Sequence, residues 1–319
     1  MSVPEKMQAV LFDSYGSPDV LHVAEVPVPI PAANEVLVRV RAAGVNPADT
    51  GLRAGKYKLF SGSRFPMGLG LDLAGEVAQV GTGVKDFRPG DAVYTFRDAG
   101  RPGSYAQYAT VSATHLAPKP KTLGFTEAAA VPVAALTALQ GLRVRGELKA
   151  GQRLLVIGAS GGVGTFAVQM GKLLGAHVTG VCSTRNVELV RGLGADEIID
   201  YTRESFVSGG RSWDVILDTV GTDYGASKKA LARRGTWVTI VPSPKVVFYT
   251  ALRMLPGGPR VHTFMAQPEA AQLREVAEWI DSGRLRVLVE KVYPLPEVAE
   301  AHRHSESHRA RGKLVLELP

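Results

Sequence analysis

The chain has 319 residues with 37 lysine and arginine against 30 aspartate and glutamate side chains, which gives a formal net charge of +7. Hydrophobic residues make up 45% and charged residues 21%, values that exclude disordered and collagen-like chains. The single cysteine, Cys182, excludes intrachain disulfides and zinc sites built from several thiolates. The length corresponds to about two domains.

Neither a membrane nor nucleic acid is an expected partner. The longest nearly uncharged apolar stretch, residues 128–139, is shorter than the about 20 residues that a membrane span needs. Basic residues occur in pairs such as Lys228-Lys229, without longer runs or interleaved aromatic residues. The N-terminus shows no secretory signal pattern, so a cytoplasmic location is expected. The positive charge instead suits a phosphorylated cofactor.

The region from Met7 to about Pro120 predicts a mostly β unit. Period-two alternation and short apolar runs bounded by proline and glycine predict strands at 8–12, 35–41, 74–80 and 92–95. Between Thr122 and Gly146, alanine and leucine at helical spacing mark the end of this β unit.

Strands alternate with helices after Gly151. This alternation predicts a parallel sheet with helices on both faces, a doubly wound α/β domain. The expected strands are 153–157, 177–182, 197–199, 213–218, 235–241 and about 260–264, and the expected helices are 162–174, 186–192 and 223–232. Past Gln267 we expect a helix at 268–282, a strand at 287–292, a helix from Pro296 and a strand at 313–318.

A glycine-rich loop joins the first strand of this region to the helix that follows it. Glycines allow a tight turn there and bring backbone N–H groups against a pyrophosphate at the positive end of the helix. Glycine clusters also form ordinary turns, but the strand before, the helix after and a second strand about 20 residues on favour dinucleotide binding. The predicted loop residues are Gly158, Ser160, Gly161, Gly162, Val163 and Gly164.

The end of the second strand predicts which dinucleotide binds. An NAD site places Asp or Glu there for the ribose 2′-hydroxyl, whereas a 2′-phosphate requires hydroxyl groups and a cation. Here Ser183, Thr184 and Arg185 follow the strand, and no acidic residue occurs before Glu188. We therefore predict NADPH, with the alternative that Ser183 or Thr184 only caps the next helix.

Several segments together carry a family resemblance: 43–49, 70–77, 103–108, 128–137, 158–164, 193–196, 199–201 and 312–316. In this order and spacing the chain resembles the medium-chain dehydrogenase/reductase superfamily, in its zinc-independent, zeta-crystallin-like quinone oxidoreductase branch. The resemblance implies a GroES-like β domain at 1–120 and 267–319, a Rossmann NADPH-binding domain at 121–266, and an active site where they meet. It also implies a homodimer or a tetramer.

Zinc-dependent members of that superfamily differ from this chain at the metal ligands. They have a Cys where this chain has Asn46, a His where it has Leu71 or Asp72, and a four-cysteine lobe. No metal is therefore expected. His304 and His308 could meet on a helix, but their charged neighbours favour a solvated surface. Without zinc, reduction of a conjugated carbonyl is more feasible than alcohol oxidation, because its charge spreads through an enolate or hydroquinone.

The resemblance implies two catalytic residues. Asn46 matches a position near the nicotinamide and the substrate carbonyl, and Tyr57 matches a tyrosine that could donate a hydrogen bond to the acceptor oxygen. An Asn-Pro turn and a buried ring are the alternatives. Gly51 stands where many quinone reductases carry a second aromatic residue, which leaves quinone stacking in doubt. For Asp49 and Asp72 we expect structural roles.

Further cofactor contacts are predicted outside the loop. Thr137 matches a residue near the nicotinamide and phosphates, Tyr201 one beside the adenine, and the predicted site also contains Asn46, Val220, Phe264 and Lys313. The apolar segment 242–259 follows the fifth strand and could be a lid, a subunit contact or helix core. We favour a cleft wall and interface.

The leading prediction is an NADPH-dependent oxidoreductase that transfers hydride to a quinone or an α,β-unsaturated carbonyl without zinc. An enoyl-thioester reductase is a second reading, and the space around Tyr57 and Phe248 would discriminate it. A non-catalytic NADPH-binding protein is a third, because a fold does not guarantee a function.

Overall fold

The computed structural model describes residues 3–98, 100, 102–252 and 260–319. Two units are distinguished, one formed by the chain up to Val133 together with Gln267–Pro319 and the other by Ala134–Ala266. We expected the second domain to begin at residue 121. The stretch before Val133 belongs to the first unit because its helix α3 (Phe125–Ala129) packs on β3 (Glu35–Val45) and β5 (Asp72–Val80). Among the described residues, no helix is both long and apolar enough to cross a membrane.

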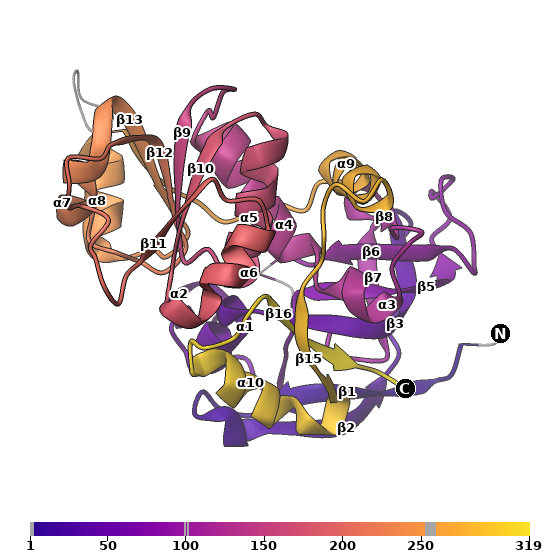
Figure 1. The fold of residues 1–319 in the computed structure, drawn as a ribbon. Helices are drawn as coiled ribbons and strands as arrows, with labels where there is room; N and C mark the ends of the chain where they lie inside the picture. Colours follow the sequence, from indigo (N-terminus) through magenta and orange to yellow (C-terminus); the bar gives the residue numbers. More distant parts are fainter. Residues whose placement is uncertain (1–2, 99, 101, 253–259) are drawn as a thin grey trace. The chain divides into compact units, whose positions relative to one another are not determined.

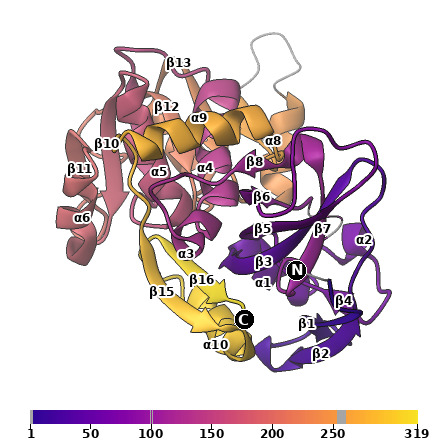
Figure 2. The ribbon, with the colours of Figure 1, turned by 90° about the vertical axis from the view of Figure 1, so that its right-hand side faces the viewer.

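Both ends of the chain build the first unit. Its larger sheet has the order β15-β16-β3-β5-β6-β8, and β7 also pairs with β3 (Figure 1). The C-terminal strand β16 runs antiparallel beside β3, as Figure 2 shows. A smaller sheet has the order β2-β1-β4. The other elements are β1 (Lys6–Phe12), β2 (Leu21–Pro27), α1 (Pro47–Arg53), α2 (Lys58–Ser61), β4 (Met67–Gly68), β6 (Ala92–Phe96), β7 (Tyr108–Ser112), β8 (Ala117–Pro118), α9 (Ala270–Asp281), β15 (Val289–Pro294), α10 (Val298–Glu306) and β16 (Lys313–Glu317), with 3₁₀ turns at Pro18–Val20, Ala113–His115 and Leu295–Glu297.

The second unit is a parallel sheet in the order β11-β10-β9-β12-β13-β14. Its strand order moves outward in both directions from β9, and Figure 1 shows α5 and α6 on one face and α7 and α8 on the other. This arrangement confirms the predicted doubly wound α/β domain. The elements are β9 (Arg153–Ile157), α5 (Gly162–Leu173), β10 (His177–Cys182), α6 (Val187–Gly192), β11 (Glu197–Asp200), β12 (Trp213–Asp218), α7 (Tyr224–Ser227), β13 (Leu231–Thr239), α8 (Pro244–Leu252) and β14 (Val261–Thr263); α4 (Pro132–Leu139) spans the division, a π-helix covers Gln140–Arg145, and 3₁₀ turns lie at Thr184–Asn186 and Lys228–Ala230.

The prediction of a helix at 223–232 was wrong for the second half of this range. Strand β13 already begins at Leu231, which pairs with Trp213, and the register then shifts so that Thr236 pairs with Val215. Gly235 lies in this irregularity, where a Cβ would meet the carbonyl oxygen of Trp213 at 2.9 Å. The bulge therefore depends on glycine, and the helical pattern of the sequence does not reveal it.

The segment 242–259 contributes to the core of the second unit. In α8, Val246 is buried in the core, and Tyr249 packs against it. Val247 and Phe248 point outward and are more than half exposed. The helix-core alternative therefore holds for one face of α8, and residues 253–259 lie outside the described residues.

Helix α10 buries a histidine in the first unit. His302 is fully buried, and its ring meets Tyr105 edge to face at 6.0 Å between centroids. Neither ring nitrogen has a hydrogen-bond partner among the described residues. Burial, with a smaller contribution from the Arg53 guanidinium, lowers the pKa of His302 to about 3.

Replacing His302 with leucine should make folding less sensitive to acid. The native state keeps this imidazole neutral down to about pH 3, whereas the unfolded chain takes up the proton near its ordinary pKa of about 6.5. The unfolded state therefore binds more protons between these values, and wild-type stability falls as the pH falls through them. Urea unfolding at about pH 7.5 and about pH 5 measures the free energy of unfolding, and this free energy should fall less between the two pH values in the variant than in the wild type.

At neutral pH the variant should lie within about 1.5 kcal/mol of the wild type, because it exchanges side chains of similar volume and removes two unpaired nitrogens. The same acid response in both proteins would show that native His302 is protonated well above pH 3.

Candidate active site

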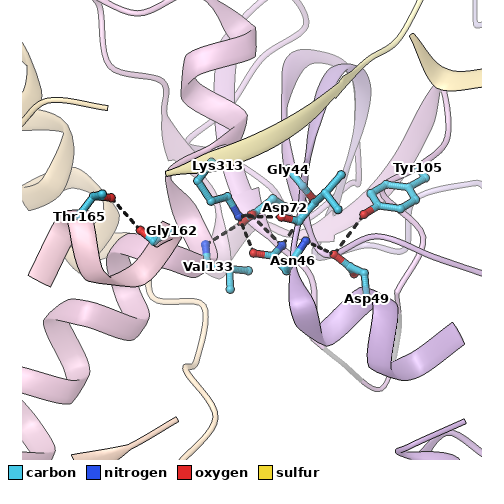
Figure 3. A network of polar contacts seen from close by, with 10 residues as sticks. Gly44, Asn46, Asp49, Asp72, Tyr105, Val133, Gly162, Thr165 and Lys313 are labelled. Atoms are coloured by element: carbon cyan, nitrogen blue, oxygen red, sulfur yellow. Dashed lines mark hydrogen bonds and ion pairs between the residues drawn. The ribbon is translucent and has the colours of Figure 1, made fainter. Parts of the chain in front are cut away.

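Three neighbouring strands of the first unit bring Asn46, Asp72 and Lys313 together. Asn46 follows the last residue of β3, while Asp72 and Lys313 are the first residues of β5 and β16. Both of these strands run antiparallel to β3, so their starts lie beside its end. Figure 3 shows the three side chains converging at this point.

The three side chains form a closed polar network. The Lys313 ammonium donates to Asn46 Oδ1 at 2.5 Å, Asp72 Oδ2 at 3.0 Å and the Val45 carbonyl oxygen at 3.4 Å. Asp72 Oδ2 also accepts from Asn46 Nδ2 at 3.0 Å, and its Oδ1 accepts from the backbone N–H of Val133 at 2.7 Å. All three side chains are at least 95% buried, so the ion pair and its hydrogen bonds compensate charges that have lost water.

Gly44 allows the network to close. A Cβ at this position would lie 2.5 Å from the Ala129 carbonyl oxygen and 2.6 Å from Asp72 Oδ2. Any side chain here would therefore displace Asp72 or α3.

Asp49 stabilises the start of α1 through a hydrogen bond with the backbone of Asn46. Its Oδ2 accepts from the backbone N–H of Asn46 at 2.9 Å and from the Tyr105 hydroxyl at 3.2 Å. Burial raises the pKa of Asp49 to about 7; nearby Asp72 adds to this effect, while hydrogen bonding to Asn46 and the Lys313 charge oppose it. These contacts agree with the structural role expected from the sequence.

The donor set at this position does not fit zinc. The oxygen atoms of Asn46 and Asp72 already accept from an ammonium group, and neither imidazole nor thiolate joins them. Within the described parts of the chain, no three His, Cys, Asp or Glu side chains are grouped to hold a metal ion. The alternative in which His304 and His308 meet on one helix does not hold, because α10 ends at Glu306 and His304 contacts Tyr293 and Glu290.

Tyr57 lies against Gly51. A Cβ on Gly51 would meet the tyrosine ring at 2.8 Å, so the glycine provides the space that this ring occupies. The ring packs against the core of the first unit, and burial raises the pKa of the phenol above its ordinary value. An aromatic residue at position 51 would displace Tyr57, which explains in physical terms why this chain has one aromatic residue here.

The glycine-rich loop of the second unit uses its glycines for different reasons. Gly158 has a positive φ of +82°, and a Cβ there would meet Thr219 Oγ1 at 2.4 Å. At Gly164 a Cβ would lie 2.1 Å from the Gly158 carbonyl oxygen, so this glycine lets α5 pack on the loop. At Gly161 a Cβ would lie 3.5 Å from the Gly158 carbonyl oxygen, the nearest atom outside its two chain neighbours. Space therefore remains at Gly161, beside the unsatisfied N–H groups of the first turn of α5.

Sequence reasoning missed two residues, one that supports this loop and one that shapes its neighbour. Asn186 is buried, and its Nδ2 donates to Ser160 Oγ at 2.9 Å and to Ser183 Oγ at 3.3 Å. Asp218 is fully buried at the end of β12, where it accepts three backbone N–H groups and one hydroxyl of residues 220–222. Asn186 thus links the glycine loop to the predicted 2′-phosphate residues, and Asp218 shapes the neighbouring loop.

A carboxylate lies beside the predicted 2′-phosphate residues. Thr184 donates to Asp200, which also accepts from Thr202 and pairs with Arg203 at 3.5 Å. Asp200 ends β11 and lies opposite Cys182 in the sheet register. No acidic residue directly follows β10 in the sequence. Asp200 comes close to the end of β10 only because β11 pairs with β10.

The remaining predicted cofactor residues of the second unit differ in exposure. Thr137 on α4 is buried, while Tyr201 is 63% and Val220 59% exposed. Phe264 is half-buried beside Gly141 and 5.6 Å from the Arg145 guanidinium. Their contact with a cofactor stays a prediction.

Two family models and a plant relative match this chain. The family described as Alcohol dehydrogenase GroES-like domain matches residues 32–121, and the family described as Zinc-binding dehydrogenase matches residues 193–316. The NADPH-dependent alkenal/one oxidoreductase, chloroplastic, of Arabidopsis thaliana is 36% identical over 99% of this chain and 80% of its own length.

The chain belongs to the medium-chain dehydrogenase/reductase family, in its quinone oxidoreductase branch. The quinone oxidoreductase of Coxiella burnetii superposes with a TM-score of 0.92 at 32% identity, covering 98% of this chain and 100% of that one. The Escherichia coli quinone oxidoreductase, solved with NADPH, gives a TM-score of 0.83 at 29% identity, covering 97% and 99%. As a member of this branch the protein is an oxidoreductase with a nicotinamide cofactor, and the open space at Gly161 fits a dinucleotide.

Valine at Gly161 and valine at Gly164 should have different effects. Gly161→Val should weaken NADPH binding at least tenfold, about 1.4 kcal/mol, with a normal melting temperature, because its Cβ would make only an ordinary 3.5 Å contact outside its chain neighbours. Gly164→Val should lower the melting temperature, because its Cβ would overlap the loop backbone. NADPH fluorescence titration and thermal unfolding of both variants provide the measurement. Tight NADPH binding by Gly161→Val would contradict the assignment of the loop.

Proposed function

We propose that this protein is an NADPH-dependent reductase of quinones or α,β-unsaturated carbonyl compounds and that it works without zinc. The observation that carries the proposal is the Lys313 ammonium on the oxygen atoms of Asn46 and Asp72, a donor set that does not fit zinc. Without a Lewis acid, the favoured reaction is one whose anionic product is delocalised. The names of the Arabidopsis and bacterial relatives support the same acceptor classes.

Asn46 and Tyr57 would supply hydrogen bonds to the acceptor. NADPH supplies the hydride when it is bound. The Asn46 amide nitrogen has two hydrogens; one is used by Asp72 at 3.0 Å, and the other has only the Gly44 carbonyl at 3.5 Å, the outer limit of a hydrogen bond. The phenol of Tyr57 is protonated at neutral pH, since its ordinary pKa is about 10 and burial raises that pKa further. Both groups can therefore donate to an oxygen that gains negative charge.

The cofactor preference rests on the residues after β10. Ser183 is half-buried, and Thr184 and Arg185 are exposed, so the hydroxyl groups and the cation that a 2′-phosphate requires lie at the surface. Asp200 opposes this preference, but Thr184, Thr202 and Arg203 already engage its carboxylate. We therefore propose NADPH over NADH.

We further propose a cytoplasmic location and a homodimeric or tetrameric assembly. The exposed Val247 and Phe248 on α8 support the assembly, because adjacent large apolar side chains favour a covered surface.

Steady-state NADPH oxidation tests the function directly. The panel contains a benzoquinone, an alkenal, an enoyl thioester and a saturated ketone, each measured with and without a metal chelator. We expect turnover of the quinone or the alkenal, none of the saturated ketone, and no effect of the chelator. Turnover of the enoyl thioester alone would assign the protein to biosynthetic reduction, and loss of activity on chelation that zinc restores would contradict the metal-free reaction.

Tyr57→Phe and Asn46→Ala should each lower the rate of acceptor reduction about 10–1000-fold, because each removes one hydrogen bond to the developing anion. NADPH affinity should change little in both variants. Tyr108→Phe on β7 is the matched control for removal of a phenol and should keep wild-type rates. Full activity of both site variants would show that the acceptor does not bind at Asn46 and Tyr57.

The wild type should bind NADPH at least tenfold more tightly than NADH, about 1.4 kcal/mol, and Arg185→Ala should remove most of that difference. Arg191→Ala is the matched control, because Arg191 is an exposed arginine on α6 that pairs with Glu188. Fluorescence titration with both dinucleotides gives the ratio. Equal affinities in the wild type would refute the proposed preference.

A further inference from the structure

We infer that Lys313 is a positioning residue for the reduction site, whose ammonium fixes and polarises the Asn46 amide. This role replaces the cofactor contact that the sequence predicted for Lys313. The inference rests on the proposed function, because it concerns how Asn46 is prepared to donate to the acceptor.

The hydrogen-bonding capacity of Lys313 is already used within the protein. A lysine ammonium has three hydrogens and no acceptor, and here three oxygens receive them: Asn46 Oδ1, Asp72 Oδ2 and the Val45 carbonyl. The side chain is 5% exposed. No hydrogen remains for a dinucleotide, so the geometry points away from a cofactor ligand.

The same contacts determine which way the Asn46 amide faces. An asparagine amide can turn over and exchange its oxygen and nitrogen, because the two ends have the same shape. Here a cation faces one end at 2.5 Å and a carboxylate faces the other at 3.0 Å. In the reversed orientation the NH₂ group would face the ammonium and the oxygen would face the carboxylate. Lys313 and Asp72 together therefore hold one orientation and fix the direction of the second N–H.

The ammonium also makes that N–H a stronger donor. A positive charge on the amide oxygen draws electron density from the nitrogen, and hydrogen bonds in a chain polarise one another in a low-dielectric interior. Asn46, Asp72 and Lys313 are all buried, so water screens little of this effect. A neutral amide thereby acquires part of the electrostatic effect that a bound cation would have on the acceptor.

Two other roles for Lys313 give different expectations. A purely structural ion pair would affect folding, and its removal would reduce activity equally with or without the Asn46 side chain. A cofactor ligand would affect NADPH affinity. A positioning residue acts through Asn46, so its effect on turnover depends on the Asn46 side chain and leaves NADPH affinity unchanged.

A double-mutant cycle separates these roles. The variants are Lys313→Met, Asn46→Ala and the two combined, with Lys6→Met as the control because Lys6 forms an exposed ion pair with Glu25 in the same unit. Each is measured for kcat with a quinone or alkenal, for NADPH affinity by fluorescence and for thermal unfolding. We expect Lys313→Met to lower kcat about 10–100-fold alone but less than about 3-fold in the Asn46→Ala background, with NADPH affinity within about 2-fold throughout.

Lys313→Met leaves Asp72 buried without its cation and could fail to fold. The neutral combination Asp72→Asn with Lys313→Met provides the second test. It removes both charges together, so it should fold, yet it should keep the low kcat because nothing fixes the Asn46 amide. Recovery of wild-type kcat in this combination would overturn the inference, whereas partial recovery by Lys313→Arg would support it.

The remaining outcomes are distinguishable. If the wild type oxidises NADPH with none of the acceptors, the proposed function fails. If the wild type is active but Lys313→Met lowers kcat by the same factor with and without the Asn46 side chain, the positioning role fails and the proposed function stands. A loss of NADPH affinity in Lys313→Met beyond about tenfold would return Lys313 to the cofactor site.

Discussion

The buried ion pair between Lys313 and Asp72 is the constraint on which the first unit depends. Burying either charge without the other would cost about 3–5 kcal/mol. The two residues start β16 and β5, which flank β3 from opposite ends of the sequence. The C-terminal strand β16 must therefore pair in register with β3 before Lys313 can hydrogen-bond to Asn46. This links completion of the fold to formation of the site.

The glycine-rich loop of the second unit depends on backbone geometry, in contrast to the ion pair of the first unit. Gly158 supplies a left-handed conformation, Gly164 supplies close helix packing, and Gly161 leaves open space. The fold itself requires glycine at Gly158 and Gly164. At Gly161 the fold does not require glycine, so a bound ligand could be the reason for glycine there. Of the four glycines in this loop, two thus meet folding constraints, and under the proposed function Gly161 meets a binding constraint.

Local patterns predicted most of the strands and the doubly wound sheet, because alternation and short apolar runs follow directly from burial. They could not predict contacts set by strand register. Asp200 reaches Thr184 because β11 pairs with β10, and Lys313 reaches Asn46 because β16 pairs with β3. The bulge at Gly235 shortened an expected helix for the same reason, since it arises from pairing with a distant strand. Resemblance located Asn46 and Lys313 separately, but only pairing explains why they touch.

Under the proposed function, the ammonium in this network also limits the chemistry. All three of its hydrogens go to protein oxygens, so its charge reaches an acceptor only through one polarised amide N–H of Asn46. A single donor of this kind stabilises a localised alkoxide less than a directly coordinated metal ion does. It is sufficient where the acceptor delocalises the charge over a conjugated system. The range of substrates is then set by the electronic structure of the acceptor more than by its shape, which accords with relatives named for both quinones and alkenals.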